Sequence, residues 1–452
     1  MANIFSDKTA PGPPGHVLLG NLLKVRQDRL KFLSDLTSQF GDVVRFRMGP
    51  KILHLINHPE YIKYVLEDNH KNYHKGIGLA QAKPLLGEGL LTSEGKIWEN
   101  QRRLVQPAFH RQQIADFVTV INDATLSTLN GWKNHTDRGQ SLDVAEEMMH
   151  LTLSILCRTL FSTDIAAQSK TIYEALRVVL EYAIHSMTSL FNLPESFPTP
   201  RNRNFRKALC QLDKFVYDLI NERRYGNNKT DDLLSILLLA TDQETNNRMS
   251  EKQLRDQVLT ILLAGHETTA NLLAWIWYLL SRNSMVEHQL NMEVTEVLNG
   301  RTPTFHDLYQ LKYTKMVIEE SMRLYPPVWL IPRKAIGQDE IGGYYIPEGS
   351  EVLISPYTMH RHPNFWENPD EFDPKRFTSE QLADRPRYTY FPFGGGSRYC
   401  IGSSFAMMET QLVIAMIVQK YRLRLVSDYL VKPEPLLTLR PHHGILMTLQ
   451  EV

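Results

Sequence analysis

The order of apolar and polar positions predicts a largely helical chain. Apolar residues keep helical spacing over most of 110–224, and the proline-rich segment 194–200 separates two long amphipathic helices there. The longest helical pattern covers 250–282, opened by Ser250 and closed by Asn283, and shorter helices are expected over about 284–299, 304–310 and 313–324. A helix as long as 250–282, rising about 1.5 Å per residue, spans a whole domain.

Short strands are expected in two regions. Alternating apolar residues over 43–48 and 52–56 predict a hairpin with Gly49-Pro50 as its turn. After Pro326-Pro327 the chain changes to short strands, and an irregular segment over about 361–392 follows. Because no repeat, low-complexity tract or linker divides the sequence, we expect one mainly α domain over 1–452, with a small β-rich lobe and a Pro-rich N-terminal segment over 1–20.

Charge and cysteine content exclude several classes of function. Lysine plus arginine equals aspartate plus glutamate, 50 of each, so no charge excess favours a nucleic acid partner. Three scattered cysteines form neither a disulfide framework nor a zinc cage, which indicates a reducing, cytoplasmic location. Residues 1–10 lack the apolar core of a signal peptide or anchor, and no run of about 18 apolar residues follows, so we expect a soluble protein.

A glycine-rich loop around Cys400 is the first candidate for chemistry. Glycines at 394–396 permit a tight backbone path and close approach to a flat group. The apolar run after it predicts a buried helix with Ser403 or Ser404 as N-cap. Loop N–H groups and the helix dipole then favour a thiolate at Cys400, which suits an axial ligand to haem iron. On these residues alone, a buried structural cysteine beside a turn is the alternative.

Two helical segments carry further polar candidates. Residues 94–103 predict a helix capped by Thr92-Ser93, in which Trp98 and Arg102 stand four apart and project from one face. A buried tryptophan beside a solvated arginine has the same spacing. Glu320 and Arg323 stand three apart on a later helix and can form an ion pair.

The long helix contains Ala264-Gly265-His266-Glu267-Thr268-Thr269. Gly265 weakens the helix and allows a flat ligand to approach its backbone, and the Thr268 hydroxyl can bond back to the carbonyl of Ala264. A polar kink in a buried helix is the alternative. The zinc motif His-Glu-x-x-His is excluded because residue 270 is alanine.

Taken together, these motifs resemble those of the cytochrome P450 family. The loop over 393–402 matches Phe-x-x-Gly-x-Arg-x-Cys-x-Gly completely, and 264–269 is similar to the family's oxygen-activation motif. Glu320-x-x-Arg323, with Pro-Lys-Arg-Phe over 374–377, resembles the family's Glu-x-x-Arg motif and its third partner. The matches keep the family's order from Trp98 to Gly402. The residues within the long-helix and Glu-x-x-Arg motifs resemble those of fatty-acid-hydroxylating and eukaryotic-type members of the family. The missing anchor indicates a soluble bacterial-type member.

The resemblance implies a haem b site and assigns its residues. Cys400 would be the axial ligand of the iron, Thr268 and Glu267 would support oxygen activation and proton relay, and Glu320, Arg323 and Arg376 would hold the segment before the cysteine. Expected around the haem are Trp98, Arg102, Arg333, Arg398, Phe393, Gly402, Ala264 and Gly265. Expected in the substrate pocket are Ile261, Leu262, Val328, Trp329, Leu330 and Leu437, with the loop over 77–86.

The implied reaction is insertion of one oxygen atom of O2 into a C–H bond of a hydrophobic substrate, a fatty acid or a terpenoid. With no reductase domain in the sequence, electrons would come from a separate ferredoxin or flavodoxin with its reductase, and the protein would be a monomer. Basic residues Lys96, Arg102, Arg103 and Arg111 could form part of an acidic partner's docking face or a solvated helix face. A haem carrier or sensor is an alternative, whereas the Glu267-Thr268 pair argues against a peroxide-driven or isomerising member.

Overall fold

The structure, a computed structural model, describes residues 8–137, 139–165, 168–188, 194–226, 232–240 and 248–452. Within these ranges it excludes the side chains of 80–81, 84–85, 111–113, 134, 136–137, 184 and 187–188. The chain divides into two compact units. The first comprises residues 1–80 and 319–400, and the second comprises 81–318 and 401–452.

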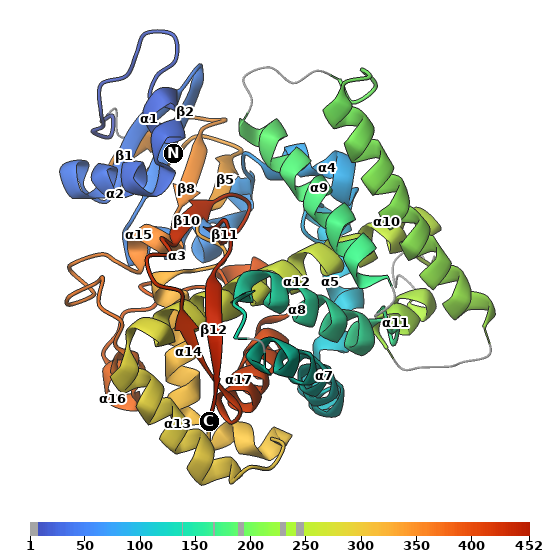
Figure 1. Cartoon of the computed structure of the whole chain (residues 1–452). Coiled ribbons are helices and arrows are strands. Elements are labelled where there is room, and N and C mark those ends of the chain that lie inside the picture. The colour runs from blue at the N-terminus through green and yellow to red at the C-terminus, as the bar shows by residue number, and fades with distance from the viewer. Residues whose placement is uncertain (1–7, 138, 166–167, 189–193, 227–231, 241–247) are drawn as a thin grey trace. The chain divides into compact units, whose positions relative to one another are not determined.

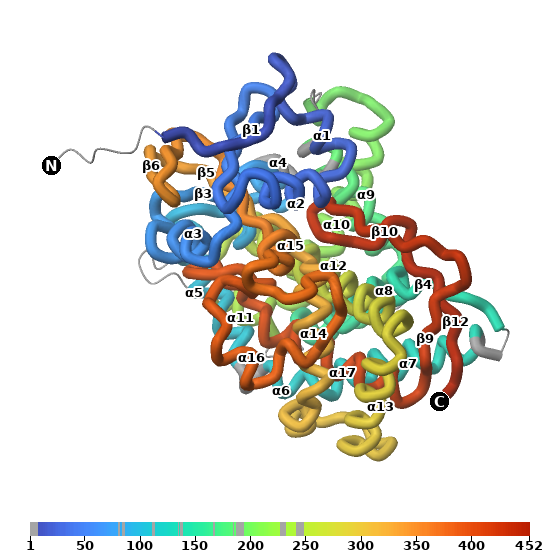
Figure 2. Tube along the Cα trace, turned by 90° about the vertical axis from the view of Figure 1, so that its left-hand side faces the viewer, coloured from blue at the N-terminus to red at the C-terminus, as the bar shows by residue number. Residues whose placement is uncertain are grey.

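The first unit is built on a five-stranded sheet of order β1-β2-β8-β5-β3. β1 (Val43–Met48) and β2 (Lys51–Ile56) form the predicted hairpin, with Gly49 at φ +60° in its turn. β2 pairs in parallel with β8 (Glu351–Ile354), and β5 (Ile331–Ala335) lies antiparallel between β8 and β3 (Tyr73–Lys75). Strands from the two ends of this unit's sequence therefore lie side by side (Figure 2).

Short helices and a second, two-stranded sheet complete the first unit. The small sheet pairs β6 (Asp339–Ile341) with β7 (Tyr344–Ile346). The helical segments are α1 (Leu22–Gln27), α2 (Arg29–Phe40), α3 (Pro59–Lys63), η1 (Tyr64–Asp68), η2 (His70–Asn72), α15 (Pro356–Met359), η5 (Pro374–Phe377), α16 (Ser379–Ala383) and η6 (Gly396–Arg398). The predicted irregular segment before Cys400 is thus confirmed, with only short helical turns in it.

The second unit is helical and is organised around α12 (Glu251–Arg282), which confirms the predicted long helix. Ser250 caps it in a capping box with Gln253. α8 (Val144–Leu160) packs along α12, α9 (Ser169–Thr188) pairs with α10 (Pro200–Tyr225), and α17 (Ser403–Val418) packs on α7 (Val118–Asp137) (Figure 1).

Other helical segments of this unit are α4 (Leu79–Leu86), which begins in the first unit, α5 (Gly95–Val105), η3 (Gln106–Phe109), α6 (Arg111–Asp116), α11 (Leu233–Leu239), α13 (Ser284–Leu298), η4 (Phe305–Tyr309) and α14 (Lys312–Leu324), which continues into the first unit. One antiparallel sheet has the order β4 (Leu142–Asp143), β12 (Leu446–Glu451), β9 (Tyr421–Leu425). A separate hairpin joins β10 (Lys432–Pro435) to β11 (Leu439–His442).

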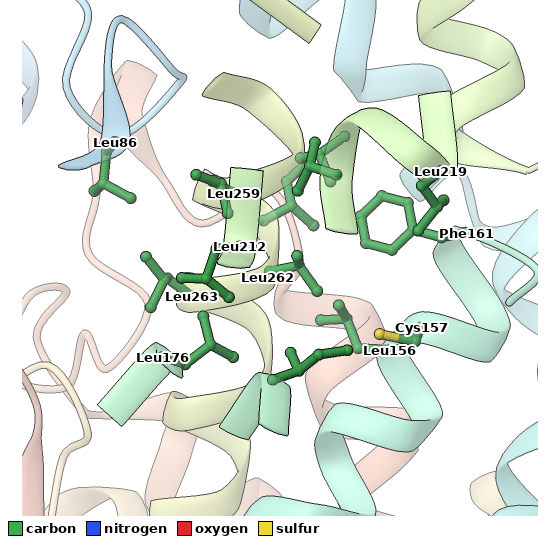
Figure 3. Packing of buried hydrophobic residues seen from close by; sticks show 14 of the residues in the cluster. Leu86, Leu156, Cys157, Phe161, Leu176, Leu212, Leu219, Leu259, Leu262 and Leu263 are labelled. Carbon is green, nitrogen blue, oxygen red and sulfur yellow. The ribbon is translucent and has the colours of Figure 1, made fainter. Parts of the chain in front are cut away.

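Leucine-rich faces of α8, α10 and α12 meet in the core of the second unit (Figure 3). Leu262 and Leu212 are fully buried there, and each such side chain contributes roughly 1.5–3 kcal/mol through removal from water. Cys157 lies in the same cluster, where burial raises the pKa of its thiol to about 12. Cys157 is therefore a structural, protonated cysteine.

Two predicted helix caps are wrong. The N-cap of α5 is Glu94, because the Thr92 hydroxyl donates to the carbonyl of Gly87 and the Ser93 hydroxyl to Oε1 of Gln101. α17 begins at Ser403 with Gly402 as its N-cap, so neither Ser403 nor Ser404 caps the helix. Among the residues described, none of the helices has the length and apolar character needed to cross a membrane.

Candidate active site

The cysteine loop is closed by a hydrogen bond from the backbone N–H of Cys400 to the carbonyl of Phe393, 3.0 Å long. Gly394 and Gly396 have φ of +73° and +63°, which other residues adopt only with strain. At Gly396 a Cβ atom would stand 2.0 Å from the carbonyl oxygen of Leu66, so glycine is required. The closed loop leaves Cys400 exposed, three residues before α17 begins.

Two arginines of the first unit were predicted to contact the haem. Arg398 lies in the cysteine loop, within η6, and Arg333 lies on β5. Both residues are half-buried. Guanidinium groups match carboxylates in shape and charge, which keeps both residues suited to haem propionates.

A short open face interrupts the otherwise buried α12. From Leu254 to Trp277 every residue is buried except Ala264, which is exposed, and Gly265 and Thr268, which are half-buried. These three lie within one turn of the helix. The Thr268 hydroxyl donates to the carbonyl of Ala264 at 2.7 Å, as predicted.

Gly265 has a packing role that the sequence did not reveal. A Cβ atom there would stand 2.2 Å from Cδ1 of Leu156 on α8, so the missing side chain lets the two helices approach. The hydroxyl of Thr152 on α8 also donates to the carbonyl of His266, at 3.1 Å. The expected use of Gly265, ligand approach to the helix backbone, stays a prediction.

Glu267, the predicted proton relay, lies on the buried side of α12 with 6% of its surface exposed. The hydroxyl of Thr438 donates to its Oε1 at 2.7 Å. Burial raises the pKa of Glu267, and the Thr438 hydrogen bond and the charge of Arg440 oppose this shift only in part. The carboxyl therefore keeps its proton at a pH where an exposed glutamate has lost it.

Trp98 and Arg102 project from the same face of α5, as predicted. Both line a shallow cavity of about 340 Å³ whose other walls come from the same helix and the turn after it. Those walls are Glu99, Arg103, Gln106, Pro107 and His110. Their predicted contact with haem propionates stays a prediction.

The predicted ion pair of α14 is present and fully buried. Arg323 donates from Nε and Nη2 to the two carboxylate oxygens of Glu320, at 2.7 and 2.8 Å. Arg376 is the third member, with Nε 3.4 Å from Glu320. Arg323 also donates to the carbonyls of His360, Pro369 and Glu371. The group thus holds the irregular segment that precedes Cys400.

The predicted pocket residues differ in exposure. Leu262 is fully buried in the core, with its side chain among those of Leu212 and Leu263 (Figure 3), and Ile261 and Trp329 are also buried. Val328 is exposed, and Leu330 and Leu437 are half-buried. In the loop over 77–86, the side chains of 80–81 and 84–85 lie outside the described residues.

Comparison with known proteins decides the family. The family model described as "Cytochrome P450" matches residues 10–448. The chain belongs to the cytochrome P450 family. This P450 is 40% identical to cyclooctatin synthase of Streptomyces melanosporofaciens, over 94% of its own length and 92% of that protein. It is 33% identical to pentalenene oxygenase of Streptomyces avermitilis, over 96% and 95%.

A solved structure shows the same fold. The crystal structure of the cytochrome P450DA haem domain matches 99% of this P450 and 98% of that chain, with a TM-score of 0.88 and 29% identity. The predicted mainly α P450 fold with a β-rich lobe is therefore confirmed. So is the predicted activity class, since the chain is a P450 monooxygenase.

The residues present fit the haem that this family implies. The exposed residue Cys400 lies on a loop whose glycines cannot be replaced without strain, and α12 leaves one turn of its surface open at Ala264 and Thr268. Thiolate is an established axial ligand of haem iron.

Sequence reasoning missed two polar residues next to Glu267. Thr438 and its neighbour Asn271 were not among the predicted site residues. Thr438 lies 171 positions from Glu267 and belongs to no motif. The only hint was that Glu267 is an acid without a hydrogen-bond partner nearby in the sequence, so a distant residue would have to supply one.

Proposed function

We propose that this P450 inserts one oxygen atom into a C–H bond of a terpenoid. The observation that carries the substrate class is full-length similarity to terpenoid oxygenases. Besides the two relatives above, a cyclooctat-9-en-7-ol 5-monooxygenase of Streptomyces melanosporofaciens is 38% identical over 92% of this chain. The partly exposed apolar residues Val328, Leu330 and Leu437 are suited to such a substrate.

We assign haem b as the cofactor: Cys400 would hold its iron, and Arg333, Arg398, Trp98 and Arg102 would bind its propionates. When bound, the haem supplies cleavage of O2 with two electrons and two protons, giving one water and one oxygen atom for the substrate. Phe393, Gly402, Ala264 and Gly265 complete this proposed assignment. The similarity along 10–448 supports treating the whole chain as one haem domain.

The chain's own residues handle the protons. Thr268 presents a hydroxyl on the open turn of α12, anchored through the Ala264 carbonyl. Burial raises the pKa of Glu267, which favours its protonated form, and we assign Glu267 as the proton donor. A substrate site lined by apolar side chains would exclude water and so limit the loss of reducing equivalents as peroxide.

Electrons are assigned to a separate ferredoxin or flavodoxin with its reductase. Lys96, Arg102 and Arg103 on α5 give basic charge for an acidic partner, and the side chain of Arg111 lies outside the described residues. Dependence on such a partner, a monomeric state and a cytoplasmic location are part of this proposal.

The test is a titration of the ferric holoprotein with terpenes, terpene alcohols, fatty acids and steroids, followed by the haem absorbance. A saturable shift with terpenoids, then an oxygenated terpenoid product with ferredoxin, its reductase and NADH, is the expected result. A shift with fatty acids alone would overturn the substrate class. Binding without any product would favour the carrier or sensor function.

A further inference from the structure

One face of α12 is hydrogen-bonded to the β10–β11 hairpin, and both belong to the second unit (Figure 1). Glu267, Asn271 and Trp275 are spaced four apart, so they lie on one face. Thr438 donates to Glu267 Oε1 at 2.7 Å, and Nδ2 of Asn271 donates to the Thr438 hydroxyl at 3.1 Å. Nε1 of Trp275 donates to the carbonyl of Leu439 at 2.9 Å.

The side chains that make these hydrogen bonds are buried. Thr438 is 4% exposed, Asn271 1% and Trp275 0%. A hydrogen bond in such a site is not exchanged for one to solvent, and breaking it leaves a buried polar group unsatisfied. The contacts to Thr438 and Leu439 therefore fix the hairpin next to Glu267.

The chain of donors has a direction. The amide nitrogen of Asn271 can only donate, so it occupies a lone pair of the Thr438 oxygen. The single hydroxyl proton of Thr438 is then directed to Oε1 of Glu267. In the neutral acid the carbonyl oxygen is the better acceptor of the two oxygens, so this hydrogen bond to Oε1 favours the tautomer with the proton on Oε2.

We propose that Thr438, supported by Asn271, is a positioning residue that holds Oε1 of Glu267 as an acceptor and so places its transferable proton on Oε2. The inference rests on the proposed role of Glu267 as proton donor. Without the Thr438 hydroxyl, either carboxyl oxygen can carry the proton and the side chain can rotate. The proton that Glu267 donates then no longer occupies one defined position.

The same hairpin also carries a predicted pocket residue. Leu437 directly precedes Thr438, and the backbone N–H of Leu436 donates to the carbonyls of Glu434 and Thr438, which makes the turn tight. A change at Leu437 is thereby transmitted over one peptide bond to the residue that orients the acid. The charged group of the hairpin that acts on Glu267 is Arg440, which is itself paired with Glu434 at 2.9 Å.

The test compares Thr438→Val, which keeps the side-chain shape without the hydroxyl, with Thr438→Ser, which keeps the hydroxyl. The first readout is the infrared carbonyl stretch of protonated Glu267 in the resting ferric holoprotein, identified by its absence in Glu267→Gln. We expect this band to move to higher frequency in Thr438→Val and Asn271→Leu, and to return to its wild-type position in Thr438→Ser.

The second readout is product formed per NADH, with the substrate that shifts the haem absorbance. The loss of one hydrogen bond corresponds to roughly a twofold to tenfold change, so we expect Thr438→Val to lower coupling and kcat by about that factor, with KM unchanged. Thr125→Val is the matched control, because Thr125 is a fully buried threonine on α7 whose hydroxyl donates to a backbone carbonyl.

Wild-type band position and coupling in Thr438→Val would overturn the positioning role, as would a Thr438→Ser variant that behaves like Thr438→Val. If Glu267→Gln itself keeps wild-type coupling, Glu267 is not the proton donor, and both that assignment and the positioning role of Thr438 fail, whereas the proposed substrate class stands. Loss of coupling in Glu267→Gln combined with an unaffected Thr438→Val would leave the proposed function intact and remove only the further inference.

Discussion

Two adjacent threonines of α12 make the same kind of hydrogen bond in different surroundings. Thr268 donates to the carbonyl of Ala264 and Thr269 to that of Gly265, each four residues back. Thr268 is half-buried on the open turn of the helix, whereas Thr269 is 3% exposed. Substituting the two threonines one at a time therefore distinguishes a chemical role of the hydroxyl from its contribution to the stability of the helix.

We expect Thr268→Ala to lower product per NADH by about tenfold or more and to raise peroxide, because a positioned proton-transfer group is lost. The unfolding free energy should change little, since the residue is not in the core. Measurements of NADH, product and peroxide check this. Thr269→Ala is the control, expected to destabilise the fold and leave coupling intact. Equal coupling in Thr268→Ala and the wild type would refute the role of Thr268.

At the scale of elements, a buried ion pair fixes the segment before the cysteine. Glu320 and Arg323 both have 0% exposed side chains. We expect Glu320→Gln to lower the unfolding free energy by about 3–5 kcal/mol, because it leaves a buried guanidinium uncompensated. Urea denaturation measures the loss. The exposed pair Lys31–Asp35 offers a control, since Asp35→Asn should leave the denaturation midpoint unchanged. A similarly small effect of Glu320→Gln would contradict the structural role.

The contact between α12 and α8 gives a second prediction at this scale. Gly265→Ala places a methyl group against Leu156, which is 2% exposed, and overpacking of this kind costs about 1–3 kcal/mol. In a double-mutant cycle, Leu156→Ala should make room for the new methyl group, so the double variant should be more stable than the sum of the single losses. Thermal denaturation of the four proteins tests this, and strict additivity would show that the two positions do not interact.

The molecule as a whole contains buried neutral histidines that link its stability to pH. His54 on β2 is 0% exposed, and neither ring nitrogen has a hydrogen-bond partner among the described residues. Burial, with the charge of Arg45, lowers the pKa of His54 from 6.5 to about 4. Below pH 6.5 the unfolded chain gains a proton at this residue and the folded chain does not, so stability falls as the pH falls toward 4.

We expect the wild type to lose about 2 kcal/mol of stability through His54 between pH 7.5 and pH 5, and His54→Leu to lack this loss. Urea denaturation across that range measures both proteins. Buried carboxyls with raised pKa, such as Glu409, act in the opposite direction, but they are common to both proteins and cancel in the comparison. Parallel stability curves for the two proteins would contradict the prediction.

Local sequence determined most of the helices, the β1–β2 hairpin and the cysteine loop, since periodicity, turn residues and glycines act over a few positions. It also determined that Trp98 and Arg102 share a face, and that Thr268 bonds back to Ala264, because helical spacing alone sets those relations. The motifs, which are local too, identified the family.

Only the tertiary structure decided which polar groups are satisfied and by what. Thr92 and Ser93 have the residue types of a helix cap, yet other partners engage their hydroxyls. The need for glycine at 265 comes from close packing against Leu156, 109 positions away in the chain. The hydrogen-bond partner of Glu267 is Thr438, 171 positions away. The physical reason is that burial and hydrogen bonding depend on distance in space, and a sequence specifies that distance only within a single element.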